Sequence, residues 1–156
     1  MSKRLIVLLA GVVAVTAAIA GCGSSGDSTD TTAALTKSEL IKQGDEICEK
    51  GNKAIEKEAE EFAEENNIDT EKPTKAQKEE VIVDVVAPGV RGQVEEIGDL
   101  PAPSGDEAEI EAMVSAVEEG ADELEAEPSK LIEGENPLGK GSKLARSYGF
   151  KECGEE

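Results

Sequence analysis

The 156-residue chain contains no histidine and no tryptophan, and its only aromatic residues are Phe62, Tyr148 and Phe150. Without histidine it has no Ser-His-Asp triad, no Cys-His dyad and no zinc site of the usual kind. So few rings leave little surface on which nucleic-acid bases or sugars could stack. We therefore expect a hydrophobic core built mainly from Leu, Ile, Val and Ala.

Other signatures of catalysis and metal binding are also missing. The chain has no Ser-x-x-Lys motif, and no Gly-rich phosphate loop follows a strand. Neither Asp27 with Asp30 nor Glu133 with Glu135 fits the Asp-x-Asp-x-Asp-Gly pattern of a calcium loop. Paired carboxylates could serve a glycosidase, but most acidic groups fall on the outer faces of expected helices. We expect no enzyme activity, no catalytic residue, no metal and no cofactor.

Charge is strongly unbalanced, because 35 acidic residues face 16 basic ones and the formal net charge is −19. Such a charge repels phosphate backbones and anionic lipid headgroups, which excludes nucleic acid as a partner. The acidic surface is expected to keep the domain soluble, and the alternative is an acidic docking site.

The N-terminus has the layout of a secretion signal. Lys3 and Arg4 precede an uncharged, mainly apolar stretch from residue 5 to residue 20. The next residues, Ile19-Ala20-Gly21-Cys22, resemble the lipobox of bacterial lipoproteins, in which two small residues precede a cysteine. The resemblance implies that the Cys22 thiol receives a diacylglyceryl group and that a peptidase cuts between Gly21 and Cys22. A third acyl chain is often added to the freed amine in that family.

The resemblance divides the chain into three parts: a signal peptide (1–21), a lipidated Cys22 with a flexible linker (22–35), and a domain (36–156). Cleavage removes two positive charges and leaves the mature chain at −21. Two acyl chains hold a protein durably on a membrane, and the linker has a reach of about 20 Å by random-coil scaling. The protein is then expected on the extracytoplasmic face of the cell membrane. The alternative is a transmembrane helix over residues 5–26, for which its four glycines are poorly suited.

The first helix of the domain is expected to begin at a capping box formed by Thr36 and Glu39 and to end at Asn66-Asn67. Apolar residues then recur at helical spacing. On this stripe Gly44 and Gly51 destabilise a helix relative to alanine, so their expected purpose is the close approach of another helix. The stripe comprises Ile41, Gly44, Cys48, Gly51, Ile55 and Phe62.

A second helix is expected from the Thr74 and Gln77 capping box. Its β-branched run, residues 81–86, favours a strand by propensity alone. However, Val83, Val86 and Val90 keep a helical period through Pro88, and no second β-rich run exists for pairing. The pattern predicts a helix kinked at Pro88.

Two further helices complete the expected domain. Ser104 and Glu107 predict a third capping box, and Asn136 with Pro137 predicts the start of the last helix. Gly149 is expected as a left-handed C-cap, with Phe150 folding back on Leu144 or Ala145. Residues 131–132 are expected as a short buried turn. The fold class is all-α, a small bundle of about four helices.

Once Cys22 carries lipid, Cys48 and Cys153 remain as an even pair in an oxidising compartment, which predicts a disulfide. One alternative is two buried free thiols. The other is a redox pair, which the absence of a Cys-x-x-Cys motif disfavours. Residues 35–48, the connector ending at Pro103, and residues 135–138 and 145–154 also resemble small secreted actinobacterial proteins of uncharacterised function. Those proteins share an early helical cysteine and a Cys-Gly near the end. This resemblance supports the disulfide and implies no activity.

Two function classes remain open. The first is a non-catalytic, membrane-tethered interaction module with an envelope protein as partner. The second is a carrier that binds a small apolar or cationic ligand between helices. An open groove along Gly44, Gly51 and Gly120 favours the carrier, and a groove filled by another helix favours the module. An enzyme that uses only carboxylates comes third.

The lipid anchor is testable through Cys22→Ala. We expect this variant to lose labelled fatty acid and to move from the membrane to the medium, because sulfur is the atom that takes the lipid. Metabolic labelling and cell fractionation measure both. Label retained on the variant would disprove the anchor.

Overall fold

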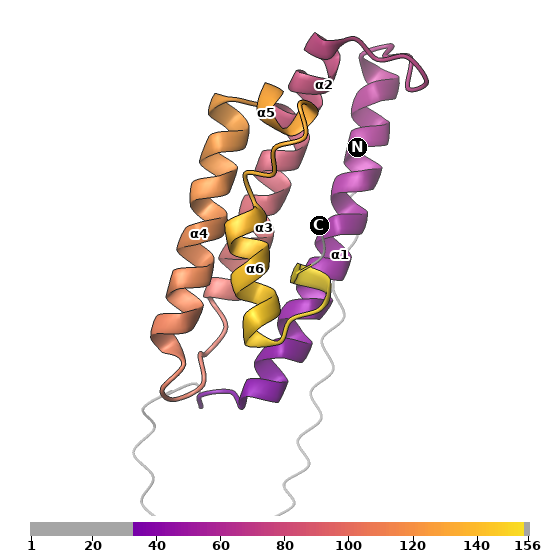
Figure 1. The fold of residues 1–156 in the computed structure, drawn as a ribbon. Helices are drawn as coiled ribbons and strands as arrows, with labels where there is room; N and C mark the ends of the chain where they lie inside the picture. The colour runs from indigo at the N-terminus through magenta and orange to yellow at the C-terminus, as the bar shows by residue number, and fades with distance from the viewer. Residues whose placement is uncertain (1–32, 155–156) are drawn as a thin grey trace, which may run out of the picture. The chain divides into compact units, whose positions relative to one another are not determined.

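Every regular element between residues 33 and 154, the range that the computed structural model describes, is helical. The predicted signal peptide, Gly21, Cys22 and most of the predicted linker lie outside these described residues. The elements are α1 (Lys37–Glu65), α2 (Lys75–Val81), a π-helical turn η1 (Ile82–Val86), α3 (Ala87–Gly98), α4 (Glu107–Ala126), α5 (Ser129–Ile132), α6 (Gly139–Tyr148) and a 3-10 turn η2 (Glu152–Gly154). The expected all-α bundle is confirmed. Its long members are α1, the joined α2–η1–α3, α4 and α6 (Figure 1).

The first two helices begin where their capping boxes predict. Thr36 Oγ1 accepts a hydrogen bond from the backbone N–H of Glu39, and the Glu39 carboxylate accepts one from Thr36 N–H at 2.9 Å. Thr74 and Gln77 repeat this arrangement at the start of α2. These reciprocal bonds satisfy N–H groups that a helix start leaves without partners.

The helix predicted through Pro88 is confirmed, and the strand interpretation of residues 81–86 is wrong. The chain accommodates the proline with one π-helical turn, in which Ala87 N–H donates to the carbonyl of Ile82. A wider turn relieves the clash and the missing hydrogen bond that proline causes in an α-helix. Its extra residue shifts the buried face by one position, so Ile82 and Val85 are buried where Val83 and Val86 were expected.

The predicted start of α4 is wrong. Residues 104–106 form a turn in which Gly105 has a positive φ of 98°, and Asp106 rather than Ser104 is the N-cap, without a side-chain cap bond. The Glu107 carboxylate accepts a hydrogen bond from Gly105 N–H at 2.7 Å. The carboxylate therefore supports the turn and completes no capping box.

Two features before α6 also differ from expectation. Asn136 Oδ1 accepts a bond from Leu138 N–H at 3.0 Å, but this closes a turn over Pro137, and the helix begins only at Gly139. The short buried turn expected at residues 131–132 is instead the surface helix α5. Leu131 there is 38% exposed, because four residues form a single turn with only one face against the bundle.

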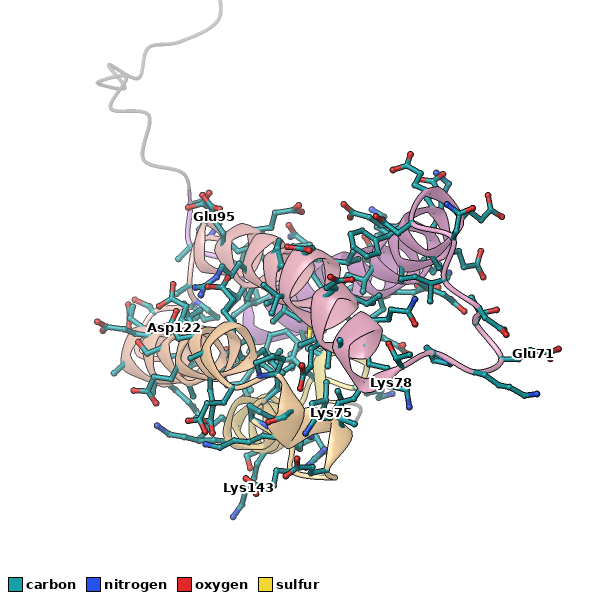
Figure 2. All side chains as sticks on the ribbon, turned by 90° about the horizontal axis from the view of Figure 1, so that it is seen from above. Glu71, Lys75, Lys78, Glu95, Asp122 and Lys143 are labelled. Atoms are coloured by element: carbon teal, nitrogen blue, oxygen red, sulfur yellow. A yellow bond between two sulfur atoms is a disulfide. The ribbon has the colours of Figure 1, made fainter. Side chains whose placement is uncertain are left out.

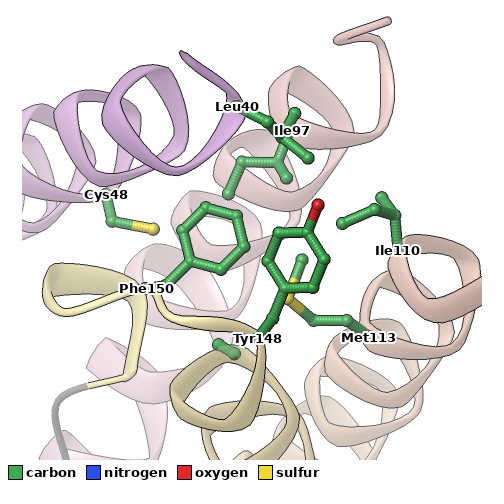
Figure 3. Packing of buried hydrophobic residues seen from close by; sticks show 8 residues of the cluster. Leu40, Cys48, Ile97, Ile110, Met113, Tyr148 and Phe150 are labelled. Carbon is green, nitrogen blue, oxygen red and sulfur yellow. The ribbon is translucent and has the colours of Figure 1, made fainter. Parts of the chain in front are cut away.

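The helices pack as neighbours in a simple order: α3 contacts both α1 and α4, and α4 contacts α6 (Figure 1). The larger core cluster draws on the first half of α1, the end of α3, α4 and the C-terminal segment (Figure 3). A smaller one joins Ile82, Ala87 and Leu124. Among the described residues no helix is both long and apolar enough to cross a membrane. The buried members of the larger cluster are Leu40, Cys48, Ile97, Ile110, Met113, Ala145, Tyr148 and Phe150.

The core is less purely aliphatic than expected, because two of the three aromatic residues sit at its centre. Tyr148 and Phe150 are each 3% exposed, and their rings stack with centroids 5.5 Å apart. The Tyr148 hydroxyl donates to Asp106 Oδ2 at 2.7 Å, and Lys37 Nζ lies 3.8 Å from the centre of the Tyr148 ring. Burial raises the pKa of Tyr148 above its ordinary value, and the hydrogen bond to Asp106 raises it further.

This raised pKa predicts how stability changes at alkaline pH. The unfolded chain loses the Tyr148 proton near pH 10 and the folded chain keeps it longer. The contribution is therefore full below about pH 10 and is lost as pH rises through the folded pKa. Tyr148 is the only tyrosine, so absorbance at 295 nm reports its ionisation directly. We expect a midpoint clearly above 10 that coincides with unfolding.

The matched control is Tyr148→Phe, which should show no absorbance change and a weaker dependence of its unfolding free energy on pH above 10. Ionisation near pH 10 in a chain whose circular dichroism is still native would contradict the buried hydrogen bond to Asp106.

Candidate functional site

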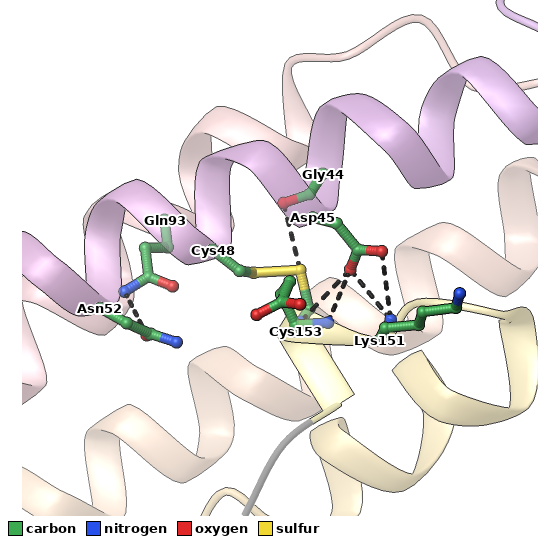
Figure 4. The surroundings of a disulfide bond; sticks show 8 residues. Gly44, Asp45, Cys48, Asn52, Gln93, Lys151 and Cys153 are labelled. Carbon is green, nitrogen blue, oxygen red and sulfur yellow. Dashed lines mark hydrogen bonds between the residues drawn. A yellow bond between two sulfur atoms is a disulfide. The ribbon is translucent and has the colours of Figure 1, made fainter.

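A disulfide joins the first helix to the end of the chain. Cys48 in α1 and Cys153 in η2 are bonded, with an S–S distance of 2.09 Å and a Cα–Cα distance of 5.2 Å (Figure 4). The predicted disulfide is confirmed, and the alternative of two free thiols is wrong. The bond spans 105 positions. In the chain-entropy account, closing a loop of that length stabilises the fold by at most about 4.7 kcal/mol.

Asp45 holds the same C-terminal turn by hydrogen bonds. Its Oδ1 atom accepts from three successive backbone N–H groups, those of Lys151 at 3.0 Å, Glu152 at 3.0 Å and Cys153 at 3.4 Å (Figure 4). The carboxylate thus caps the start of η2 from another helix. The sequence gives no local signal for this contact, because Asp45 lies more than 100 positions from the groups it binds.

Gly44 provides the third contact with this segment. A Cβ atom at Gly44 would lie 2.4 Å from Cε1 of Phe150, so only glycine leaves room for the ring. The close approach predicted at Gly44 therefore exists, but a phenylalanine ring makes it and not another helix. Phe150 is placed by Gly149, which ends α6 with a positive φ of 124°, as the C-cap prediction required.

The proposed glycine groove is filled along its length. The side chain of Gln93 covers Gly51, where a Cβ would lie 2.3 Å from its Cγ atom. At Gly120 the backbone carbonyl of Pro137 occupies the space, 2.6 Å from the position of a Cβ. The groove is therefore not open to a ligand at these glycines, but only Gly51 is covered from another helix, by Gln93 of α3.

A partly open cavity of about 130 Å³ remains beside the disulfide. Four polar side chains line part of it, and Gln93 Nε2 donates to Asn52 Oδ1 at 3.2 Å. Its volume is below the range of about 300–1,000 Å³ typical of sites for drug-sized ligands. The polar lining residues are Asn52, Gln93, Ser142 and Glu152.

The second half of α1 carries an exposed acidic surface. We define the acidic flank as Glu58, Glu61, Glu64 and Glu65, all exposed. Glu61 pairs with Lys57 at 2.8 Å, whereas the other three make no ion pair or side-chain hydrogen bond with the described part of the chain. Figure 2 shows side chains along this end of α1 directed away from the bundle.

Basic side chains elsewhere are largely engaged. Arg91 of α3 bonds both Asp122 and Glu125 of α4, which joins these helices. Lys130 pairs with Glu123 at 2.7 Å, and Lys140 pairs with Glu119 at 2.7 Å. The acidic excess therefore remains on the surface, where it is available to a positively charged partner.

The carboxylates weighed as calcium ligands in the sequence form no site among the described residues. Glu133 pairs with Lys75 at 2.9 Å, and Asp27 and Asp30 lie outside the described residues. Within residues 33–154 no group of three or more Cys, Asp or Glu side chains is placed to hold a metal ion.

Comparison with known proteins adds no family. No protein-family model matches the chain, and neither any curated protein nor any solved structure matches it. The lipobox and its consequences for Gly21 and Cys22 stay predictions from the sequence.

Proposed function

We propose that the protein is a non-catalytic interaction module, held by lipid on Cys22 at the extracytoplasmic face of the cell membrane. The lipobox-like residues 19–22 support the anchor. The polar segment after them, GSSGDSTDTTAAL, supports a flexible linker. A domain tethered to the membrane in this way can reach neighbouring envelope proteins without a transmembrane helix.

The observation that carries the proposal is the contrast between the two halves of α1. This helix is 29 residues long, or about 43 Å at 1.5 Å per residue. Its first half buries Leu40, Gly44 and Cys48, whereas its second half buries only Ala63. The acidic flank lies on that second half, and three of its four carboxylates have no partner in the described domain.

These carboxylates favour a partner with a basic surface. Attraction between exposed charges guides encounter and selects partners, and salt weakens it. An adaptor needs only such a surface, whereas an enzyme needs a nucleophile or acid–base pair, for which this histidine-free chain offers no motif. The non-catalytic proposal follows from that difference.

The carrier remains the second candidate. The filled glycine groove and the small cavity beside the disulfide give it no support. A different groove, at the far end of α1, does favour a ligand.

The test is crosslinking in living cells, from a photoreactive residue placed at position 61. We expect one envelope protein to be crosslinked to the wild-type chain. The triple variant Glu58→Lys, Glu64→Lys and Glu65→Lys should reduce this product by roughly tenfold or more, because it reverses three charges facing a basic surface.

The control reverses three exposed, unpaired carboxylates elsewhere, in Glu95→Lys, Glu96→Lys and Glu111→Lys. It should retain the crosslink at near wild-type yield. An equal loss of crosslinked product in both triple variants would show a nonspecific charge effect and contradict the assignment of the binding surface to the acidic flank. A turnover activity abolished by a single carboxylate substitution in a folded chain would replace the proposal with an enzyme.

A further inference from the structure

An apolar groove lies at the far end of the bundle, between the second half of α1, the loop 66–74, α2 and α5. Figure 1 shows this loop crossing from α1 to α2, with α5 beside α2. The groove has a volume of about 480 Å³. Its apolar lining comprises Ala59, Ala63, Ile68, Val81, Ile82 and Ile132, with Leu131 and Pro73 beside them.

The size and the floor of the groove suit a small molecule. Its volume falls within the range of about 300–1,000 Å³ that ligand sites occupy, and such sites are mainly apolar with a few polar groups. Ile82 is 7% exposed and belongs to the smaller core cluster, against which Ile132 packs. A ligand here would therefore extend that core outward.

Specific bonds hold the walls in place. Ile68 N–H donates to the carbonyl of Ala63 at 2.8 Å, after Asn67 has turned the chain with a positive φ of 54°. The ion pair between Lys75 and Glu133, at 2.9 Å, ties α2 to the residue that follows α5. The groove is thus formed before any ligand arrives, which reduces the entropy lost on binding.

The rim of the groove is acidic. Glu56 and Glu60 lie one turn apart on α1, and neither makes an ion pair within the described residues. Lys78 of α2 is the only basic residue of the lining. Two carboxylates against one ammonium, on a chain of net charge −19, favour a cation over an anion.

We propose that this groove binds a small organic cation. Its apolar body lies against Ala59, Ala63 and Ile82, and its cationic group faces Glu56 and Glu60. The proposal goes beyond the interaction module and does not depend on it, because the acidic flank uses other carboxylates.

The probes are 1-naphthylmethylammonium and 1-naphthylacetate, which share a ring system and carry opposite charges. The protein is the mature chain kept free of lipid by Cys22→Ser. Titration followed by two-dimensional ¹H–¹⁵N nuclear magnetic resonance gives both the dissociation constants and the location of binding. We expect saturable binding of the cation, at least about fivefold tighter than the anion, with shifts centred on residues 59–82 and 131–132.

Three variants test the assignment of charge and cavity. Glu56→Gln with Glu60→Gln should bring the ratio of the two affinities close to one. Lys78→Gln should strengthen cation binding. Ala59→Phe should fill the groove and weaken both probes, with circular dichroism to verify folding.

The matched control, Glu58→Gln with Glu64→Gln, removes the same charge from the acidic flank and should change cation affinity by less than about twofold. Three results would overturn the proposal: no saturable binding, shifts centred away from the groove, or equal losses in the rim variant and the control. None of them bears on crosslinking from the flank, so this inference and the interaction module can fail separately.

Discussion

Docking of the C-terminal turn onto the first half of α1 is the constraint on which the rest of the structure depends. Gly44, Asp45 and Cys48 lie within five positions and bind the same short segment in three ways. The Phe150 ring packs against Gly44, the Asp45 carboxylate caps the 3-10 turn η2, and a disulfide links Cys48 to Cys153 (Figures 3 and 4). Together they place Tyr148 and Phe150 in a core that would otherwise be aliphatic.

This docking explains why α1 has two unlike halves. The C-terminal turn covers the first half, and α3 packs beside it. Beyond residue 52 the helix still contacts the bundle, for example through Ile55, which lies against Gly89 of α3. The remaining surface of the second half carries the acidic flank on one side and borders the apolar groove on the other. One long helix therefore anchors the C-terminal turn, carries the acidic flank and forms one wall of the apolar groove.

Local signals predicted much of the fold, because helix caps and hydrophobic periods involve neighbours in sequence. Thr36, Thr74 and Gly149 mark boundaries as expected, and the assignment of Cys22 to lipid left Cys48 and Cys153 as the predicted pair. The prediction of Ser104 as an N-cap was wrong, because Gly105 adopts a positive φ and forms a turn that the capping pattern does not encode. The prediction of which residues before Pro88 are buried was wrong by one position, because a π turn adds one residue.

Contacts between distant segments could not be predicted in this way. Asp45 gives no hint in sequence that it caps residues 151–153, and Gly44 does not indicate whether a helix or a ring will cover it. The groove cannot be predicted from the sequence for the same reason. Its walls come from four segments, and its apolar residues, such as Ile68 and Ile132, are isolated in sequence and form no motif.

The central claim, that the docked turn holds only the first half of α1, is tested most directly by residue-resolved hydrogen exchange with and without reductant. In the oxidised protein, amides of residues 44–51 should exchange only through global unfolding, and those of residues 58–65 through smaller local openings. Reduction should accelerate exchange at residues 44–51 by several orders of magnitude, within the limit set by loop closure, and leave residues 58–65 nearly unchanged. Uniform protection along α1, or exchange that does not respond to reduction, would contradict the account.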